Sequence, residues 1–450
     1  MTPMRAHPDN LSQRAVMNTF RSTGLALALI AGFAGCDTAV SNPGRFEDAY
    51  LDDRNAATAM VNGAGRALSA GMNWISYTGA AVTREIHPAG STGSFGITTL
   101  WQKGELRGDD GDLDTHWEQA QRARWIAEEA VRRIEAAKPP TAIDLQTVAA
   151  YNNVLQLAYV YAGYANRVLG ENMCEATIDG GPALPSTVFL TRAESLFTKA
   201  IGVTGGTPAT IATQLTQAYA GRAAVRVQLG KWTEAVADAG QVPIGFVMNL
   251  PYFNIGDDAQ RNRIFWASGN SRESGSAYRA HTQWSTWYYD YRLATSDPRV
   301  PITITTLKGD AAIDCCGVVV FWPEAKHSSS AAPIRLSSGR EMRLIEAEAK
   351  LRASDLAGAM VSIGLVRTNA LAPAITATTL DEGWRLLKRE RGIELWLEAR
   401  RLGDMRRWKA TNAPGALDPL ELPGAGSHLT KQDLCFPISR SERETNPNLR

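Results

Sequence analysis

The chain has 450 residues, of which 44% are hydrophobic and 21% charged, with 47 Lys and Arg against 46 Asp and Glu. This is globular composition, sufficient for one large domain or a few smaller ones. The net charge of +1 lacks the basic excess with which nucleic-acid-binding proteins neutralise phosphates, so we expect no nucleic-acid partner.

The first residues have the pattern of a secretion signal. Arg21 precedes an unbroken apolar run at residues 24–34, too short to span a bilayer as a stable helix, and "AGFAGC" ends at Cys36. A cysteine after small residues resembles a bacterial lipobox, in which the thiol is acylated. We predict a lipoprotein signal peptide at residues 1–36, with Met17 as an alternative start, and a flexible tether at residues 37–45. The alternative is a plain signal peptide with an incidental cysteine.

Residues 46–450 are predicted to form a single domain carried on this lipid anchor. No later segment has the roughly 18 apolar residues of a transmembrane helix. An even number of further cysteines suits an oxidising compartment. They are Cys174, Cys315, Cys316 and Cys435. Adjacent cysteines seldom bond each other, so bonds from Cys315 or Cys316 to Cys174 or Cys435 remain open, and no Cys/His cluster suggests zinc.

Most of the domain has helical periodicity. Residues 153–169 place apolar side chains at three-four spacing and end at Gly170, and residues 191–202 and 217–242 follow, the last as two helices joined at "LGKW". Residues 341–371 repeat the plan, with a turn near Ser354 and Asp355. We predict a mainly α fold of degenerate tetratricopeptide-like repeats at about 150–242 and 341–450.

Two stretches, about 86–114 and 243–333, are rich in Gly, Ser, Pro, Asp and aromatic residues. We predict irregular loops with a few short strands. Because long irregular stretches in a compact protein are usually functional, we expect these loops to carry function.

The segment "ERGIELWLEARRLGDMRRW", residues 390–408, mixes many charges with two tryptophans. Read as one helix, it places four oppositely charged pairs three residues apart along one side. These are Arg391 with Glu394, Glu398 with Arg401, Arg401 with Asp404, and Asp404 with Arg407. Glu394 and Glu398 one turn apart face the same way and would not flank a glycosidic bond. We therefore interpret the segment as a structural helix docked on the repeats.

This segment resembles the signature of the SusD/RagB family, which runs E-R-x-x-E-L-x-x-E-G-x-R-x-x-D-L-x-R-W. Nine positions are in register, with Ala399 in place of the usual Gly. They are Glu390, Arg391, Glu394, Leu395, Glu398, Arg401, Asp404, Arg407 and Trp408. The closing "LCFPISRSERETNPNL" is similar to the family's L-x-P-I-P-x-x-E-x-x-x-N-P-N.

The resemblance implies a helical scaffold with a loop-rich ligand-binding half, lipid-anchored at the outer membrane on the cell surface. Such proteins cap a TonB-dependent β-barrel transporter (SusC-like) and capture glycans or other nutrients. It implies no cofactor and no chemistry on the ligand, so we expect a binding protein rather than an enzyme.

Aromatic residues in the irregular segments are candidates for the ligand site, because C–H faces of sugar rings pack on Trp and Tyr while polar groups bond the hydroxyls. We expect Trp284 and Trp287 to form one platform, with polar partners nearby. The candidates are Trp74, Tyr77, Trp101, Trp284, Trp287, Tyr288, Asp290 and Arg292. The alternative is that these rings seal the loops onto the helices. Trp232, Trp384, Trp396 and Trp408 are expected in the core.

Three further interpretations of the sequence concern a calcium site, a protein-binding scaffold and an enzyme. The acidic stretch at residues 109–114 departs from the calcium loop of an EF-hand and is read as a solvated loop, so no metal is expected. A repeat lipoprotein that binds protein partners in the cell envelope is the alternative function. A glycan-cleaving enzyme would need two carboxylates across a cleft.

Overall fold

The computed structural model describes residues 48–92, 97–137, 145–254, 260–268, 279–314, 316–423 and 428–449. The predictions for the signal peptide, for Cys36 and for the tether lie outside the described residues. Within them, no helix is both long and apolar enough to cross a membrane.

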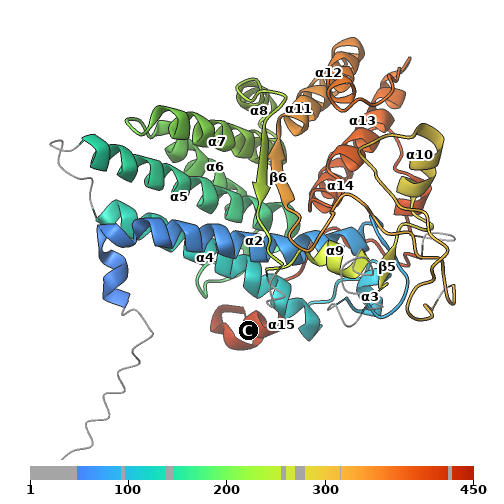
Figure 1. The fold of residues 1–450 in the computed structure, drawn as a ribbon, viewed down its shortest axis with the longest axis horizontal. Coiled ribbons are helices and arrows are strands. Elements are labelled where there is room, and N and C mark those ends of the chain that lie inside the picture. Colours follow the sequence, from blue (N-terminus) through green and yellow to red (C-terminus); the bar gives the residue numbers. More distant parts are fainter. Residues whose placement is uncertain are drawn as a thin grey trace, which may run out of the picture. The chain divides into compact units, whose positions relative to one another are not determined.

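The described part of the chain is mainly helical, as predicted (Figure 1). The long helices are α2 (Ala57–Val82), α4 (Asp114–Ala136), α5 (Leu145–Asn172), α6 (Thr187–Gly202), α7 (Pro208–Gln228), α11 (Gly339–Arg352), α12 (Leu356–Asn369) and α13 (Leu380–Glu394). The shorter ones are α3 (Thr99–Gln102), α8 (Trp232–Ala239), α9 (Arg263–Ser268), α10 (Trp287–Thr295), α14 (Arg401–Ala410) and α15 (Arg440–Thr445). Single 3-10 turns are η1 (Asp48–Asp52), η2 (Arg54–Ala56), η4 (Gly111–Leu113), η6 (Pro419–Glu421) and η7 (Pro447–Leu449).

The strands form two-stranded antiparallel ladders. They are β1 (His87–Pro88) with β5 (His281–Thr282), β2 (Glu175–Ala176) with β3 (Leu184–Pro185), and β4 (Val247–Leu250) with β6 (Ile334–Ser338). The pairing of β4 with β6 shifts register between Met248 and Asn249. β4 lies near the start of the loop-rich stretch and β6 directly follows its end. Their pairing therefore brings the two ends of that stretch together.

The predicted helical hairpins are confirmed. In Figure 1, α5, α6 and α7 lie side by side, each packed on the next, and α8 packs on α7. α11 contacts α7, α8, α12 and α13, so the second set of hairpins continues the first. Left-handed turns separate the members of two pairs, at Gly230 (φ 75°) before α8 and at Ser354 (φ 61°) before α12.

Helix α2 contradicts the prediction that Trp74 and Tyr77 lie in an irregular segment. Four glycines lower its helical propensity, but tight packing gives them a role. A Cβ on Gly71 would lie 3.2 Å from the Ala120 backbone, so the missing side chain lets α2 approach α4 closely. Gly170 likewise lies inside α5 rather than ending it, because it leaves room for Leu190.

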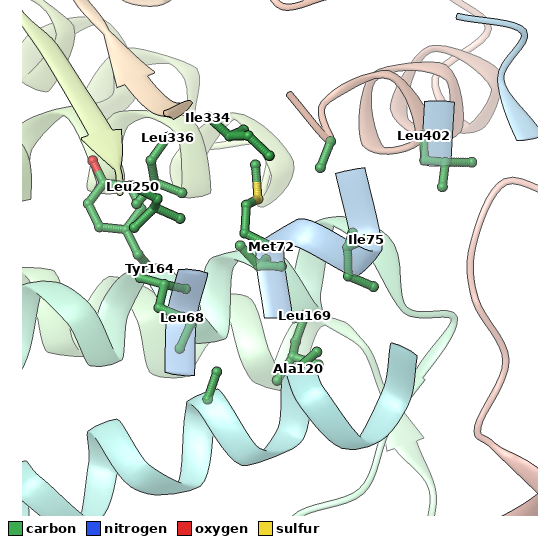
Figure 2. Close-up of a cluster of buried hydrophobic side chains, with 14 of the residues drawn as sticks. Leu68, Met72, Ile75, Ala120, Tyr164, Leu169, Leu250, Ile334, Leu336 and Leu402 are labelled. Carbon is green, nitrogen blue, oxygen red and sulfur yellow. The ribbon is translucent and has the colours of Figure 1, made fainter. Parts of the chain in front are cut away.

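The main core is built around α2. Figure 2 shows side chains from the long helices, β4, β6 and α14 converging on it. The labelled residues are Leu68, Met72, Ile75, Ala120, Tyr164, Leu169, Leu250, Ile334, Leu336 and Leu402. α2, α4, α5, α6 and the β4–β6 ladder therefore share this core, whereas α11, α12 and α13 pack around a separate cluster that includes Leu344, Ile363 and Trp384.

Cys174 and Cys435 form a disulfide with a Cα–Cα distance of 5.0 Å. It ties the end of α5 to the closing segment of the chain. This bond settles the connectivity that the sequence left open for these two cysteines and excludes their bonding to Cys315 or Cys316.

The prediction of one continuous helix over residues 390–408, hereafter the signature segment, is wrong. α13 ends at Glu394, and α14 begins at Arg401. Between them Leu397 (φ 62°) and Ala399 (φ 58°) adopt left-handed backbone conformations. Glycine takes that conformation at little steric cost, which gives a physical reason for the Gly that the family pattern has at position 399.

Breaking the helix redirects its charges. Three of the predicted pairs are not found among the described residues: Arg391 with Glu394, Glu398 with Arg401, and Arg401 with Asp404. The fourth is confirmed, with Arg407 Nη1 2.8 Å from Asp404 Oδ1. The three-residue spacing of these charged residues fits a helix, but in the structure most of them pair with residues of other elements.

The two carboxylates considered as a catalytic pair face the loop-rich region. Glu394 lies 2.9 Å from Arg335 and 2.8 Å from Arg340, and Glu398 lies 2.8 Å from Arg335 and 2.5 Å from Lys326. The Glu394 contacts are at ion-pair distance without the angles of hydrogen bonds. Both carboxylates are buried among cations rather than placed across a cleft, so neither is a glycosidase acid or base.

Three arginines of the signature segment bind carboxylates of the segment itself or of the repeats. Arg391 binds Asp404 at 2.7 Å, and Arg407 binds Glu348 of α11 at 2.7 Å. Arg400 reaches Glu171 of α5 at 2.8 Å. The free-energy cost of burying these charges is offset because each charged group pairs with one of opposite charge.

Trp396 and Leu397, in the break, bind the buried Glu85. The Leu397 N–H donates to Glu85 Oε1 at 2.9 Å, and the Trp396 indole donates to the Glu85 carbonyl at 3.4 Å. Burial raises the pKa of the Glu85 carboxyl to about 7. Trp384, Trp396 and Trp408 are buried as expected, whereas Trp232 is half-buried.

The exposed Leu371 ends α12 in a left-handed conformation (φ 55°, 88% exposed). We predict that Leu371→Gly raises the unfolding free energy by about 1 kcal/mol, because it removes backbone strain without removing a buried side chain. Leu365→Gly, at an exposed position inside α12, should lower it by about 1 kcal/mol. Denaturant titration of both variants checks the opposite signs; a loss of stability in Leu371→Gly would contradict the strain.

Glu85 should make stability depend on pH near neutrality. Its folded-state pKa of about 7 exceeds the ordinary 4.5, so its contribution is present below pH 4.5 and is lost as pH rises through 7. We predict that Glu85→Gln is more stable than wild type above pH 7 by up to about 3 kcal/mol, with the difference shrinking toward pH 5. Unfolding titrations from pH 5 to 8 measure this. The exposed Glu234→Gln should follow the wild-type profile; if Glu85→Gln does too, Glu85 is already ionised in the fold.

Candidate functional site

The candidate site begins at Thr282, the last residue of β5, whose hydroxyl organises two separate loops. It accepts the N–H of Trp284 at 3.1 Å and the N–H of Trp322 at 2.8 Å, and it donates to the Val320 carbonyl at 3.0 Å. β5 is itself held by pairing with β1. One threonine therefore brings together tryptophans that are 38 positions apart in the sequence.

Three half-buried rings, Trp284, Tyr289 and Trp322, form what we term the aromatic cluster. Tyr289 and Trp322 are stacked, with centroids 4.1 Å apart and planes at 28°. The Trp322 indole donates to the Thr305 carbonyl at 3.2 Å, which fixes its ring. Rings that are partly exposed and held by hydrogen bonds offer a rigid apolar surface at low entropic cost.

A buried cation lies beside the aromatic cluster. Arg84 has a left-handed backbone (φ 63°), is fully buried, and donates to the Ser285 carbonyl at 3.1 Å. It also bonds His87, whose ring lies 5.3 Å from that of Trp284. Burial lowers the pKa of Arg84 to about 9, and burial followed by the Arg84 charge lowers the pKa of His87 to about 2. His87 is therefore neutral, and the positive charge belongs to Arg84.

The predicted platform of Trp284 and Trp287 does not form. Thr286 caps α10 by accepting the Tyr289 N–H, so Trp287 is the first helical residue while Trp284 precedes the helix. Trp287 stacks on Tyr288 at 4.0 Å, and Tyr288 stacks on Trp396 at 5.4 Å. Both Trp287 and Tyr288 are buried in this stack, which seals α10 onto the signature segment.

Two other candidate rings are buried. The Tyr77 hydroxyl bonds His281 Nδ1 at 3.0 Å, and the Trp101 indole donates to Asp110 at 3.0 Å. Trp74 is half-buried, but the Arg263 guanidinium lies over its face, 3.5 Å from the ring centroid. These contacts pack the three rings against neighbouring helices and loops.

The two polar candidates lie on the accessible side of α10. Asp290 is exposed, and partial burial followed by the charge of Asp418 raises its pKa. Arg292 is half-buried and donates to the Asp297 carbonyl at 3.3 Å. Both remain available to a ligand.

Two members of the aromatic cluster were not among the candidates from the sequence. Trp322 ends the apolar run "CCGVVVFW", and Tyr289 directly follows the candidates Trp287 and Tyr288 in the sequence. The run is apolar throughout, so its sequence did not indicate which side is accessible; in the structure Val319 and Phe321 are buried while Val320 and Trp322 are half-buried.

Comparison with known proteins bears on both the signature and the fold. Residues 325–450 match the sequence profile of the SusD family. No curated protein sequence matches the chain.

Solved structures similar to this chain extend the likeness beyond the profile. A SusD superfamily protein from Bacteroides thetaiotaomicron VPI-5482 superposes with a TM-score of 0.61 at 13% identity, over 88% of this chain and 99% of that one. A SusD-like carbohydrate binding protein from Bacteroides vulgatus ATCC 8482 gives 0.59 at 16% identity, over 88% and 97%. A structure determined with a xylogluco-oligosaccharide gives 0.58 at 14% identity, over 87% and 98%.

At these identities the structures establish a shared fold over most of the chain, and the profile match adds the carboxyl-terminal sequence signature. The signature segment, the helical hairpins and the profile agree with one another. The carboxyl-terminal residues 325–450 thus match the SusD family, and the chain has the fold of the SusD-like structures.

Proposed function

We propose that this chain binds a glycan at the aromatic cluster, without catalysis, and passes it to a TonB-dependent β-barrel transporter at the outer membrane. The observation that carries the glycan proposal is the set of three anchored, half-buried rings beside a buried arginine. Pyranose faces stack on such rings, and Asp290 and Arg292, on the same helix as Tyr289, offer hydrogen bonds to the hydroxyls.

The fold relatives support this choice of ligand class. One is a carbohydrate binding protein, and another was determined with a xylogluco-oligosaccharide. The two glutamates of the signature segment that resembled an acid/base pair are occupied by arginine and lysine. The proposal therefore assigns binding to the loops and a structural role to the signature segment.

Glycan binding is tested by titrating the protein with soluble plant polysaccharides and their oligosaccharides, xyloglucan oligosaccharides included. We predict that Trp284→Ala and Trp322→Ala each weaken binding by about 10- to 30-fold, because a stacking tryptophan carries about 1.4–2 kcal/mol of a binding energy. Calorimetry measures the affinities, and the melting temperature of each variant shows that it is folded.

The control is Trp125→Ala, an exposed tryptophan (54%) of α4 outside the aromatic cluster. It should bind as wild type does. Wild-type affinity in folded Trp284→Ala and Trp322→Ala would contradict the site, and loss of binding in Trp125→Ala would place it on α4 instead.

Delivery and anchoring are tested separately, on full-length protein from native outer membranes. Acylation at Cys36 predicts that the Cys36→Ser protein is no longer held in the membrane fraction. Gentle extraction of the wild type should bring with it a stoichiometric β-barrel. A periplasmic protein partner without a barrel would favour the scaffold function instead.

A further inference from the structure

A cavity of about 230 Å³ is lined by Trp287, which lies two residues before Tyr289 on α10 and therefore on roughly the opposite side of that helix. α13, the start of α14 and the segment around η6 complete its wall. Its lining includes Trp287, Arg385, Arg389, Arg401, Asp418 and Glu421. We call this the α13 pocket. It is smaller than the roughly 300–1,000 Å³ of sites for drug-sized ligands, so it suits a single small group.

The α13 pocket is rich in positive charge. Four cations line it, Arg385, Lys388, Arg389 and Arg401, against the carboxylates of Asp418 and Glu421. Arg401 is paired with Glu421, and Lys388 donates to the Ala413 carbonyl at 3.1 Å. Within the described part of the chain, neither Arg385 nor Arg389 has an ion-pair partner. Arg385 is exposed and Arg389 half-buried, so both are able to meet an anion at the mouth.

The inner wall of the α13 pocket holds buried polar atoms that lack partners. Glu421 is fully buried; its Oε1 accepts the Trp287 indole N–H at 2.9 Å, while its Oε2 has no hydrogen-bond partner in the described structure. Arg401 is 4% exposed, and its Nε is likewise unpaired there. An unsatisfied buried polar atom costs roughly 1–3 kcal/mol, so these atoms favour a ligand with hydroxyl groups.

The three features together select a ligand class. The indole of Trp287 offers an apolar edge, the inner carboxylate and guanidinium offer an acceptor and a donor for hydroxyls, and the outer arginines offer charge for a carboxylate. We propose that the α13 pocket binds one acidic monosaccharide, a hexuronate, either free or at the end of a glycan chain. This site is separate from the aromatic cluster and does not depend on it.

The test uses galacturonate and galactose, which differ only in having a carboxylate or a hydroxymethyl group at C6. Calorimetric or NMR titration of the folded protein should show binding of galacturonate, and binding of galactose about tenfold weaker or undetectable. Arg385→Gln/Arg389→Gln should weaken galacturonate binding by about tenfold, whereas Arg440→Gln, an exposed arginine (52%) of α15, should not change it.

Several outcomes would overturn the proposal. Equal binding of galactose, or acetate and phosphate binding as tightly as galacturonate, would show that no acidic sugar is recognised. Wild-type affinity for galacturonate in Arg385→Gln/Arg389→Gln would place the anion elsewhere. Binding that is lost in Trp284→Ala but kept in the double arginine variant would assign the ligand to the aromatic cluster instead.

Competition distinguishes the two sources of the ligand. If chain ends are bound, trigalacturonate displaces galacturonate from the wild type. If the pocket takes only the free sugar, trigalacturonate does not compete. Either result keeps the hexuronate assignment.

Discussion

The fold depends on the buried ion pairs of the signature segment, residues 390–408. Glu394 is held by Arg335 of β6, and Asp404 is held by Arg391 of the segment itself. In the other direction, Arg407 reaches Glu348 of α11 and Arg400 reaches Glu171 of α5. Removing one partner of a buried pair leaves an uncompensated charge, so each pair constrains where its two elements lie. The segment is thus the place where the repeats and the loop-rich region are fixed to each other.

This constraint explains how irregular loops present a defined surface. Tyr288 stacks on Trp396 of the signature segment, which holds the base of α10. From that base Trp287 faces the α13 pocket, while Tyr289 stacks on Trp322. The two proposed binding sites are therefore opposite sides of one short helix, and both are positioned by the same buried network.

The sequence predicted the parts that depend on local periodicity, and missed those that depend on distant contacts. The helices of the repeats carry an apolar stripe, so their hairpins were identified; α2 was missed, because glycines such as Gly71 are explained only by α4 beside it. The break at Leu397 was hidden, because charges three apart also fit a helix. Which rings are accessible follows from the local Thr286 cap and from the distant bond between the Thr282 hydroxyl and Trp322, and the spacing of the aromatic residues indicates neither contact.

The most direct test of the central constraint is the unfolding free energy of Glu394→Gln combined with hydrogen exchange. We predict a loss of about 3–5 kcal/mol, because Arg340 then lacks its carboxylate and Arg335 keeps only Glu398, and faster exchange in both β6 and α11. Glu444→Gln, at an exposed site (68%) on α15, should change stability by less than about 0.5 kcal/mol. A change that small in Glu394→Gln, with exchange as in wild type, would show that the signature segment does not hold the two regions together.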